Sequence, residues 1–135
     1  MLDQRFAASV HIMTLLAAHS DELMTSEFLA GSITTNPTVV RRLISKLVEA
    51  GLVDSFKGKS GGVRIAKTPK EITLKDIYKA STDKSLINSR DSETHKACKV
   101  SCSMKEIFIG VADGLEANSM AYLAKIKLAD ILAKV

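Results

Sequence analysis

Tryptophan is absent from the 135-residue chain, aromatic residues make up only 4% of it, and it contains two cysteines. The shortage of aromatic side chains disfavours the stacking platforms that bind single-stranded nucleic acid. Two cysteines are too few for a disulfide scaffold, and because no signal peptide precedes them we expect a protein of the reducing cytoplasm. No apolar run approaches the roughly 20 residues that a membrane span requires, so we expect no membrane partner.

The sequence also lacks the motifs of common enzymes. It contains no P-loop, no metalloprotease spacing and no nucleophile–base pair, and His11 and His19 show no partner pattern. We therefore predict neither catalysis nor a bound cofactor. A hydrophobic content of 46% argues against general disorder, and 135 residues suffice for one domain with a core, or for a small domain with a dimerising arm.

Residues 36–51 are the most strongly patterned stretch, and they predict a helix. Asn36 is a good N-cap, and Pro37 suits the first helical position, where a missing N–H costs nothing. Gly51 ends the helix as a left-handed cap would. The residues at helical spacing on the apolar side are Val40, Leu43, Ile44, Leu47 and Val48, and those on the polar side are Thr38, Arg41, Arg42, Ser45 and Lys46.

A glycine-rich hairpin follows this helix. Residues 52–56 predict a short strand, 57–62 a turn and 63–65 a returning strand. Between residues 41 and 70 there are eight Lys or Arg against two acids, an excess of six that exceeds the whole-chain net charge of +4. Such a concentration of positive charge on a helix and hairpin is typical of a DNA-binding face. The alternative is a solvated charged face without a partner.

Two helices are expected before this segment. Residues 2–18 carry two apolar stripes, which indicates burial on two sides. Thr25 or Ser26 then caps a second, short helix, and residues 31–35 connect it to the next one. A short helix, a turn and a longer helix make a helix-turn-helix, and the hairpin makes it the winged variant. The alternative is an ordinary packed helical hairpin. The two stripes are Leu2, Phe6, Val10, Met13 and Ala17, and Ala8, Ile12, Leu15 and Leu16.

The remaining chain predicts a closing helix, a linker and a long helix. Thr73 caps a helix over residues 74–80, and a polar, weakly patterned stretch follows it. Ser103 and Glu106 have the spacing of a capping box at the start of the long helix.

The predicted long helix has an apolar stripe and a face of small residues. Glycine costs about 1 kcal/mol inside a helix, so Gly110 and Gly114 on one face suggest that a second backbone crosses there. We therefore expect a homodimer about a two-fold axis; tolerated glycines in an ordinary core helix are the alternative. The stripe is Met104, Phe108, Val111, Leu115 and Tyr122, the small face adds Ala117 and Ala121, and Leu128, Ile131 and Leu132 can cover the partner.

These elements together predict a mainly α fold with a small β-hairpin wing. We divide the chain into a winged helix-turn-helix domain (1–82), a polar linker with the cysteine pair (83–102), and a dimerisation helix with a short C-terminal helix (103–135).

Residues 25–80 read TSEFLAGSITTNPTVVRRLISKLVEAGLVDSFKGKSGGVRIAKTPKEITLKDIYKA. This stretch, with NPTVVRRL, KLVEAGLV, KGKSGGVRIAK and EITLKDIYKA in this order, resembles the Rrf2 family of bacterial winged helix-turn-helix regulators. The C-terminal LAKIKLADIL is similar to the family's final short helix, whereas Val63 stands where the family usually has an aromatic residue. The resemblance implies dimeric repressors or activators that insert the recognition helix into the major groove and lay the wing on the minor groove.

The resemblance also implies which residues bind DNA. Arginine can bind guanine at two atoms at once, and a threonine or valine methyl can touch thymine. Hydroxyls and backbone N–H groups at a helix start can bond phosphates. The base-facing candidates are Thr35, Thr38, Val39, Arg41 and Arg42, with the cap Asn36 in the same DNA-binding set; Thr25 and Ser26 are the phosphate candidates, and Lys57, Lys59, Ser60 and Arg64 are the wing candidates.

His95, Cys98 and Cys102 form an H-x2-C-x3-C motif. Iron–sulfur members of the family use three cysteines at wider spacing, and structural zinc normally takes four protein ligands, so we predict no metal. Neighbouring lysines, and the place of Cys102 directly before the expected capped helix, favour the reactive thiolate. These residues are therefore candidates for a sensor of a small oxidant or electrophile, and inert packing cysteines are the alternative.

The sequence as a whole predicts a dimeric, sequence-specific DNA-binding transcriptional regulator, a repressor, controlled by thiol oxidation or electrophile modification. Its partners would be double-stranded DNA, a second copy of the chain and that effector. The alternative is a protein-interaction module that docks on a metabolic enzyme, with cysteines that are only structural.

Overall fold

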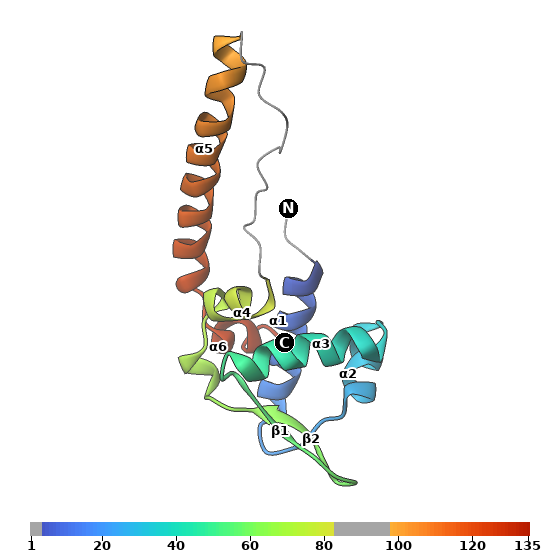
Figure 1. Ribbon diagram of the computed structural model, residues 1–135. Helices are drawn as coiled ribbons and strands as arrows, with labels where there is room; N and C mark the ends of the chain where they lie inside the picture. Colours follow the sequence, from blue (N-terminus) through green and yellow to red (C-terminus); the bar gives the residue numbers. More distant parts are fainter. Residues whose placement is uncertain (1–3, 83–97) are drawn as a thin grey trace.

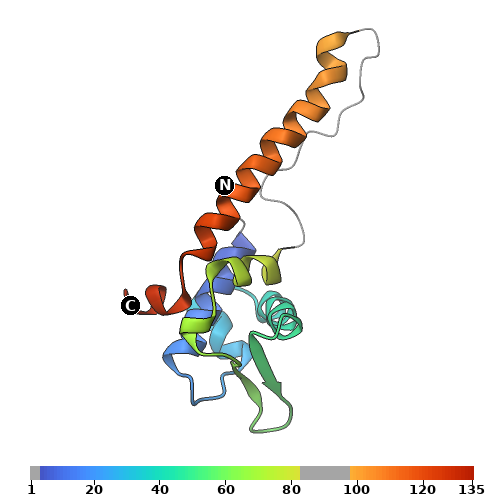
Figure 2. The same cartoon turned by 90° about the vertical axis from the view of Figure 1, so that its left-hand side faces the viewer.

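The computed structural model describes residues 4–82 and 98–135, and in these residues helices dominate. Figure 1 shows a globular unit made by the elements up to α4, from which α5 projects as a long rod; Figure 2 shows the same projection from the side. The mainly α fold with one small hairpin is confirmed. The elements are α1 (Gln4–Ala18), α2 (Ser26–Ile33), α3 (Pro37–Glu49), β1 (Val53–Phe56), β2 (Gly62–Ile65), the short 3-10 helix η1 (Pro69–Glu71), α4 (Leu74–Ser81), α5 (Lys99–Ala124) and α6 (Leu128–Leu132).

Three helices begin at the capping residues that the sequence predicts. The Thr25 side chain accepts a hydrogen bond from the Phe28 N–H at 3.2 Å, and Asn36 Oδ1 accepts one from the Thr38 N–H at 2.8 Å. Thr73 and Asp76 exchange the two hydrogen bonds of a capping box at the start of α4. Each cap satisfies a backbone N–H that the helix itself leaves unpaired.

One expected boundary is wrong. Residues 31–33, which were predicted to lie in the connection between α2 and α3, are the last turn of α2. The helix ends at Thr34, which adopts the left-handed conformation with φ 64° and ψ 52°. A β-branched residue rarely adopts this conformation, so the sequence gives no warning that a threonine ends the helix here.

Helix α1 lies at the centre of the core. Its buried residues come from both predicted stripes, with the addition of Ser9, and form one continuous face; Leu2 lies outside the described residues. The ring of Phe6 packs edge-on against the ring of Tyr78 from α4, with centroids 5.5 Å apart. The side chains with the least exposure in this core are Ile12, Met13, Leu16, Leu29, Val40, Leu47, Val53, Ile72, Ile77 and Leu128.

The hairpin is fixed to the segment between α1 and α2. Met24 and Val63 exchange two backbone hydrogen bonds, of 2.8 and 2.9 Å. A Cβ atom on Gly62 would lie 2.7 Å from the Met24 carbonyl oxygen, and one on Gly61 would overlap the Phe56 carbonyl oxygen. The paired glycines are therefore required because other backbone comes close to them.

The long helix α5 begins five residues before the predicted start. Lys99 is its first residue and Cys98 its N-cap, without a side-chain capping bond. The capping box predicted at Ser103 and Glu106 is wrong, because residues 99–102 are already helical and the Cys102 N–H bonds the Cys98 carbonyl at 3.0 Å.

At its other end α5 returns to the globular unit through α6. The Leu74 N–H bonds the Ile126 carbonyl at 2.9 Å, and the Leu128 N–H bonds the Ile72 carbonyl at 2.8 Å. Leu128 has no exposed surface. We call this pair of backbone hydrogen bonds with the buried Leu128 the clasp.

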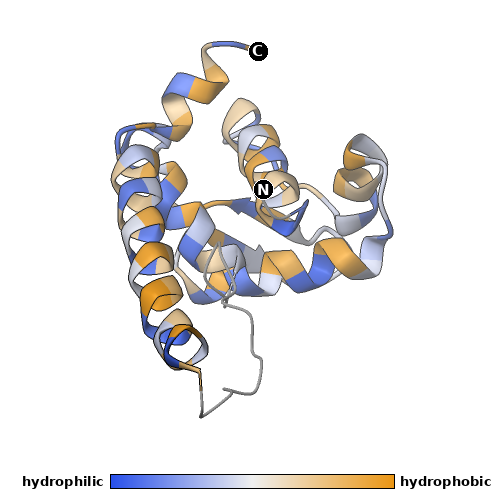
Figure 3. Ribbon diagram, turned by 90° about the horizontal axis from the view of Figure 1, so that it is seen from above, coloured by the Kyte–Doolittle hydropathy of each residue, from blue (hydrophilic) through white to orange (hydrophobic). Residues whose placement is uncertain are grey.

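Most of α5 packs against no other element among residues 4–82 and 98–135. Among its residues only Leu123 is buried, and Figure 3 shows apolar residues along the length of the rod. No described helix has both the length and the apolar character that crossing a membrane requires. The large apolar residues of α5 that remain exposed are Val100, Ile107, Phe108, Ile109, Val111, Leu115 and Tyr122.

Candidate nucleic-acid interface

The exposed side of α3 carries the side chains predicted to face bases. Residues of an α-helix are about 100° apart around its axis. Thr38, Arg42 and Ser45 therefore occupy the middle of the exposed arc, with Arg41 at the edge beside α2 and Val39 at the edge beside α1. The opposite side, with Val40, Leu43, Ile44 and Leu47, is buried in the core.

A hollow of about 460 Å³ lies between α2, α3 and the hairpin. The start of α2 contributes Thr25 and Ser26 to its lining, α3 contributes Arg41, and the hairpin contributes Lys57. The structure thus brings together four of the residues predicted to bind DNA, from three separate elements. Cationic groups and a helix N-terminus around one concavity suit an anion.

Glu27 is a residue of this hollow that the sequence analysis missed. Its Oε1 accepts a hydrogen bond from Arg41 Nη2 at 2.8 Å, and both side chains are exposed, by 65% and 56% respectively. Its own backbone N–H, and next Arg41, lower the pKa of the Glu27 carboxyl below its ordinary value of 4.5. The carboxylate therefore remains charged at neutral pH and is oriented from two sides.

The wing arginine lies apart from this hollow. The Arg64 guanidinium carbon is 4.8 Å from the centroid of the Phe56 ring, a cation–π contact. Arg64 also lines a different hollow of about 460 Å³, together with Asp21 and Lys67. Lys59 and Ser60 are exposed at the hairpin tip. The wing candidates thus reach solvent on more than one side of the hairpin.

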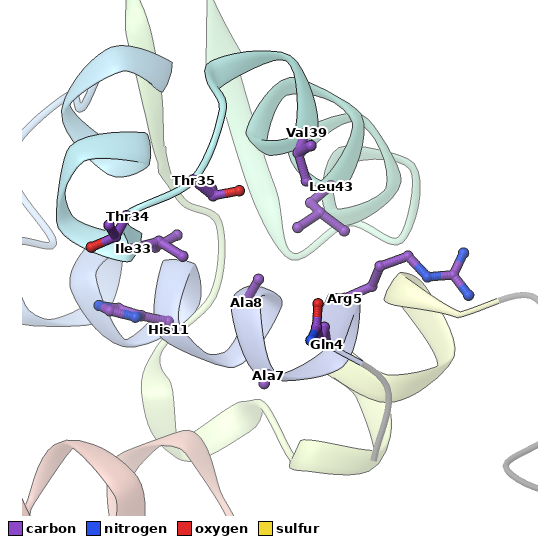
Figure 4. Close-up of a pocket in the computed structure, with 10 residues that line it drawn as sticks. All are labelled: Gln4, Arg5, Ala7, Ala8, His11, Ile33, Thr34, Thr35, Val39 and Leu43. Carbon is purple, nitrogen blue, oxygen red and sulfur yellow. The ribbon is translucent and has the colours of Figure 1, made fainter. Parts of the chain in front are cut away.

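A third cavity, of about 500 Å³, separates α1 from the α2–α3 turn. Figure 4 shows Ala8 of α1 facing Thr35 and the α3 side chains Val39 and Leu43 across it. Two of the predicted DNA-binding residues, Thr35 and Val39, thus border a cavity behind α3 instead of the hollow beside the hairpin. His11 lines the same cavity, and its Nε2 lies 3.4 Å from Ser32 Oγ.

The cysteines lie far from the hairpin. Cys98 and Cys102 are exposed at the N-terminal end of α5, at the opposite end of the molecule from β1 and β2 in Figure 1. The predicted sensor residue His95 lies outside the described residues. Within 4–82 and 98–135, no three His, Cys, Asp or Glu side chains come together as a metal site would require.

Comparisons with known proteins agree with this geometry. A family model described as Rrf2, iron-dependent transcriptional regulator, matches residues 2–134. The HTH-type transcriptional regulator YwnA of Bacillus subtilis is 32% identical over 125 residues, which cover 90% of this chain and 91% of YwnA.

Two solved structures share the fold. A transcriptional regulator from Lactobacillus plantarum has a TM-score of 0.80 at 23% identity, covering 96% of this chain and 87% of its own. CymR, the global cysteine regulator of B. subtilis, has a TM-score of 0.70 at 22% identity, covering 100% and 98%. The predicted resemblance is confirmed. The chain belongs to the Rrf2 family of transcriptional regulators, which are not enzymes.

Proposed function

We propose that the protein is a homodimeric, sequence-specific DNA-binding repressor whose helix α3 enters the major groove while the hairpin lies along the neighbouring minor groove. One observation carries this proposal: the exposed arc of α3 and the basic hairpin border the same hollow. Bases would be read by Thr38, Arg41 and Arg42, because arginine binds guanine in a bidentate manner. As a regulator of chromosomal DNA it would work in the cytoplasm.

Phosphate contacts would come from both sides of that helix. Thr25 and Ser26 stand at the N-terminus of α2, where backbone N–H groups favour an anion. Lys57, Lys59 and Ser60 are exposed on the hairpin and can follow the second strand of the groove. These contacts would fix the register of α3 on the duplex and make affinity depend steeply on salt.

A second copy of the chain is the proposed partner of α5. Exposed apolar side chains line this rod, and a patch of that kind marks an interaction surface. A Cβ atom on Gly110 or Gly114 would meet no described atom within 4 Å apart from the adjacent backbone of α5 itself, so both positions are open to a crossing backbone. Two such rods would hold two α3 helices at a fixed separation, as a palindromic site requires. The predicted division into a DNA-binding domain (1–82), a linker (83–102) and a dimerisation unit (103–135) is kept in this proposal with one change: residues 99–102 belong to the dimerisation helix α5.

Thiol chemistry is the proposed signal. Cys98 and Cys102 are exposed on successive turns at the start of α5. Cys98 is the N-cap of α5, whereas Cys102, which was predicted to lie directly before the helix, is already inside its first turns. An oxidant or electrophile that modifies either thiol would alter the end of the dimerisation helix. His95, three residues before Cys98, is the third candidate sensor residue.

Iron has no part in this proposal, although the description of the family model names it. The described residues offer two thiols and no third ligand beside them, which does not fit an iron site formed by these residues. The proposed thiol signal therefore depends on no metal or cofactor.

The test is retention of duplex DNA by the purified protein across a range of salt. A target duplex is first selected from a random pool, and the variant Arg41→Gln/Arg42→Gln is then compared with the wild type. We expect the variant to lose its preference for the target while circular dichroism shows it folded. Lys125→Gln/Lys134→Gln removes the same charge from exposed positions at the ends of α5 and α6, outside the hollow beside the hairpin, and should keep the preference.

Two outcomes would contradict the proposal. If Arg41→Gln/Arg42→Gln still prefers the target, α3 is not the element that reads bases. If the wild type binds duplex DNA weakly and independently of salt, phosphate contacts are absent. Docking on a protein partner then explains the surface better than DNA binding does.

A further inference from the structure

We propose that Glu27 is a positioning residue that sets the base selectivity of the protein by holding Arg41 on the exposed side of α3. The inference rests on the proposed DNA-binding function. It concerns a carboxylate that is located, against the usual expectation, within a surface offered to a polyanion.

The contact joins two separate helices of the helix-turn-helix. Glu27 belongs to the first turn of α2, and Arg41 lies 14 residues later on α3. The 2.8 Å distance between Oε1 and Nη2 is that of a charge-assisted hydrogen bond. The backbone N–H of Glu27 also favours the charged form of the carboxylate that accepts this bond.

A held arginine binds a base differently from a mobile one. The guanidinium has five N–H donors, so the bond to Glu27 leaves most of them available for the O6 and N7 atoms of guanine. Fixing the side chain in advance reduces the rotamer freedom that a base contact would otherwise remove. The structure therefore favours an Arg41 that is ordered before DNA arrives.

The charge of Glu27 acts in the same direction. A carboxylate at the hollow repels a backbone phosphate, and the bond to Arg41 competes with any phosphate for that guanidinium. Non-specific binding depends almost entirely on phosphate contacts, whereas specific binding also uses base edges. Glu27 thus weakens binding to random DNA more than binding to the target, and selectivity is the difference between the two.

The ion pair between Glu27 and Arg41 should contribute little to the stability of the fold. Both side chains are more than half exposed, and exposed ion pairs contribute little to stability. We therefore expect Glu27→Gln to melt at essentially the wild-type temperature, so that changes in DNA binding report on the interface and not on folding.

The experiment measures affinity for the target duplex selected by the wild type, and for a random duplex, in four proteins. These are the wild type, Glu27→Gln, Arg41→Gln and the double variant. For Glu27→Gln we expect tighter binding to random DNA, with one more phosphate contact and a salt slope steeper by about 0.9. Over a fourfold range of salt that slope amounts to about a threefold change in affinity, and the target-to-random ratio should fall by a similar factor.

Two comparisons isolate the pair. In the Arg41→Gln background, Glu27→Gln should change the target-to-random ratio by clearly less than it does in the wild type, because the residue that it positions is gone and only the repulsion between carboxylate and phosphate remains. Glu49→Gln removes one carboxylate from the opposite end of α3 and is the control for net charge; it should also leave the ratio unchanged.

The inference is overturned if Glu27→Gln tightens binding to both duplexes equally, since that is a general charge effect. It is also overturned if the ratio falls to the same extent without Arg41. These results leave the proposed function intact, whereas a wild type with no preferred duplex would overturn both.

Discussion

Replacing Gly62 with alanine tests how the hairpin is held in place. The new Cβ atom would lie 2.7 Å from the Met24 carbonyl oxygen and 3.1 Å from both the carbonyl carbon and the amide nitrogen of that residue. All three atoms are backbone, so no side chain can rotate away. The segment before α2 and the hairpin must therefore separate.

The magnitude follows from what that separation breaks. Met24 and Val63 exchange two backbone hydrogen bonds, each worth about 1 kcal/mol net, and residual strain in a packed site adds about 1 kcal/mol. We expect the free energy of unfolding to fall by about 2–3 kcal/mol. For a domain of this size that corresponds to a melting temperature lower by roughly 8–12 °C.

Thermal unfolding followed by circular dichroism, at one fixed protein concentration, measures the loss. Gly31→Ala is the matched control, because a Cβ there meets no atom within 4 Å and the position is inside α2. Alanine should stabilise that helix by about 1 kcal/mol. If Gly62→Ala melts within a degree or two of the wild type, the close approach to Met24 does not constrain the hairpin and the reasoning fails.

Three further predictions address the rod, the thiols and the carboxylate. Gly114→Leu should convert a dimer into monomers on a sizing column, because a crossing backbone has no room for the larger side chain. Cys98→Ser and Cys102→Ser, alone or together, should reduce the release of target DNA by diamide or a quinone. In an NMR titration, Arg41→Gln should raise the pKa of Glu27 while leaving it below 4.5, since the backbone N–H is the larger cause of its lowering. In the wild type the small stabilisation from this carboxylate is present above pH 4.5 and is lost as the pH falls through the lowered pKa.

Each of these has a result that would contradict it. A dimer that survives Gly114→Leu would show that no second backbone crosses at that glycine. As a control, Ala124→Leu, at an exposed position in the last turn of α5, should leave the dimer intact. If oxidants release target DNA from the double serine variant as readily as from the wild type, the cysteines are not the sensor. A pKa of Glu27 that is the same with and without Arg41 would show that the ion pair does not persist in solution.

The sequence was informative wherever a structural signal is local. Asn36, Thr25 and Thr73 were predicted as caps because a side chain that bonds an N–H two or three residues ahead is a short-range pattern. The same logic failed at Ser103 and Glu106. Their spacing matches a capping box, but nothing local shows that the preceding residues are already helical.

Contacts between elements were harder to foresee. The bond from Arg41 to Glu27 joins residues 14 positions apart on two helices, so no periodicity marks it. Likewise, the spread of candidate DNA-binding residues over separate hollows depends on how α3 is rotated against α1 and α2. The charge count over residues 41–70 does not include Glu27, which contacts Arg41 from α2.

The clasp has a mechanical consequence for α5. A helix of 26 residues, at about 1.5 Å per residue, is about 39 Å long. If the clasp holds α5 rigidly to the globular unit, the two rotate together, and a rotation of about 10° moves the tip at Cys98 by about 7 Å. A large sideways movement of the tip is therefore coupled to a small change in the orientation of α3. This coupling requires that neither the rod nor the clasp bends.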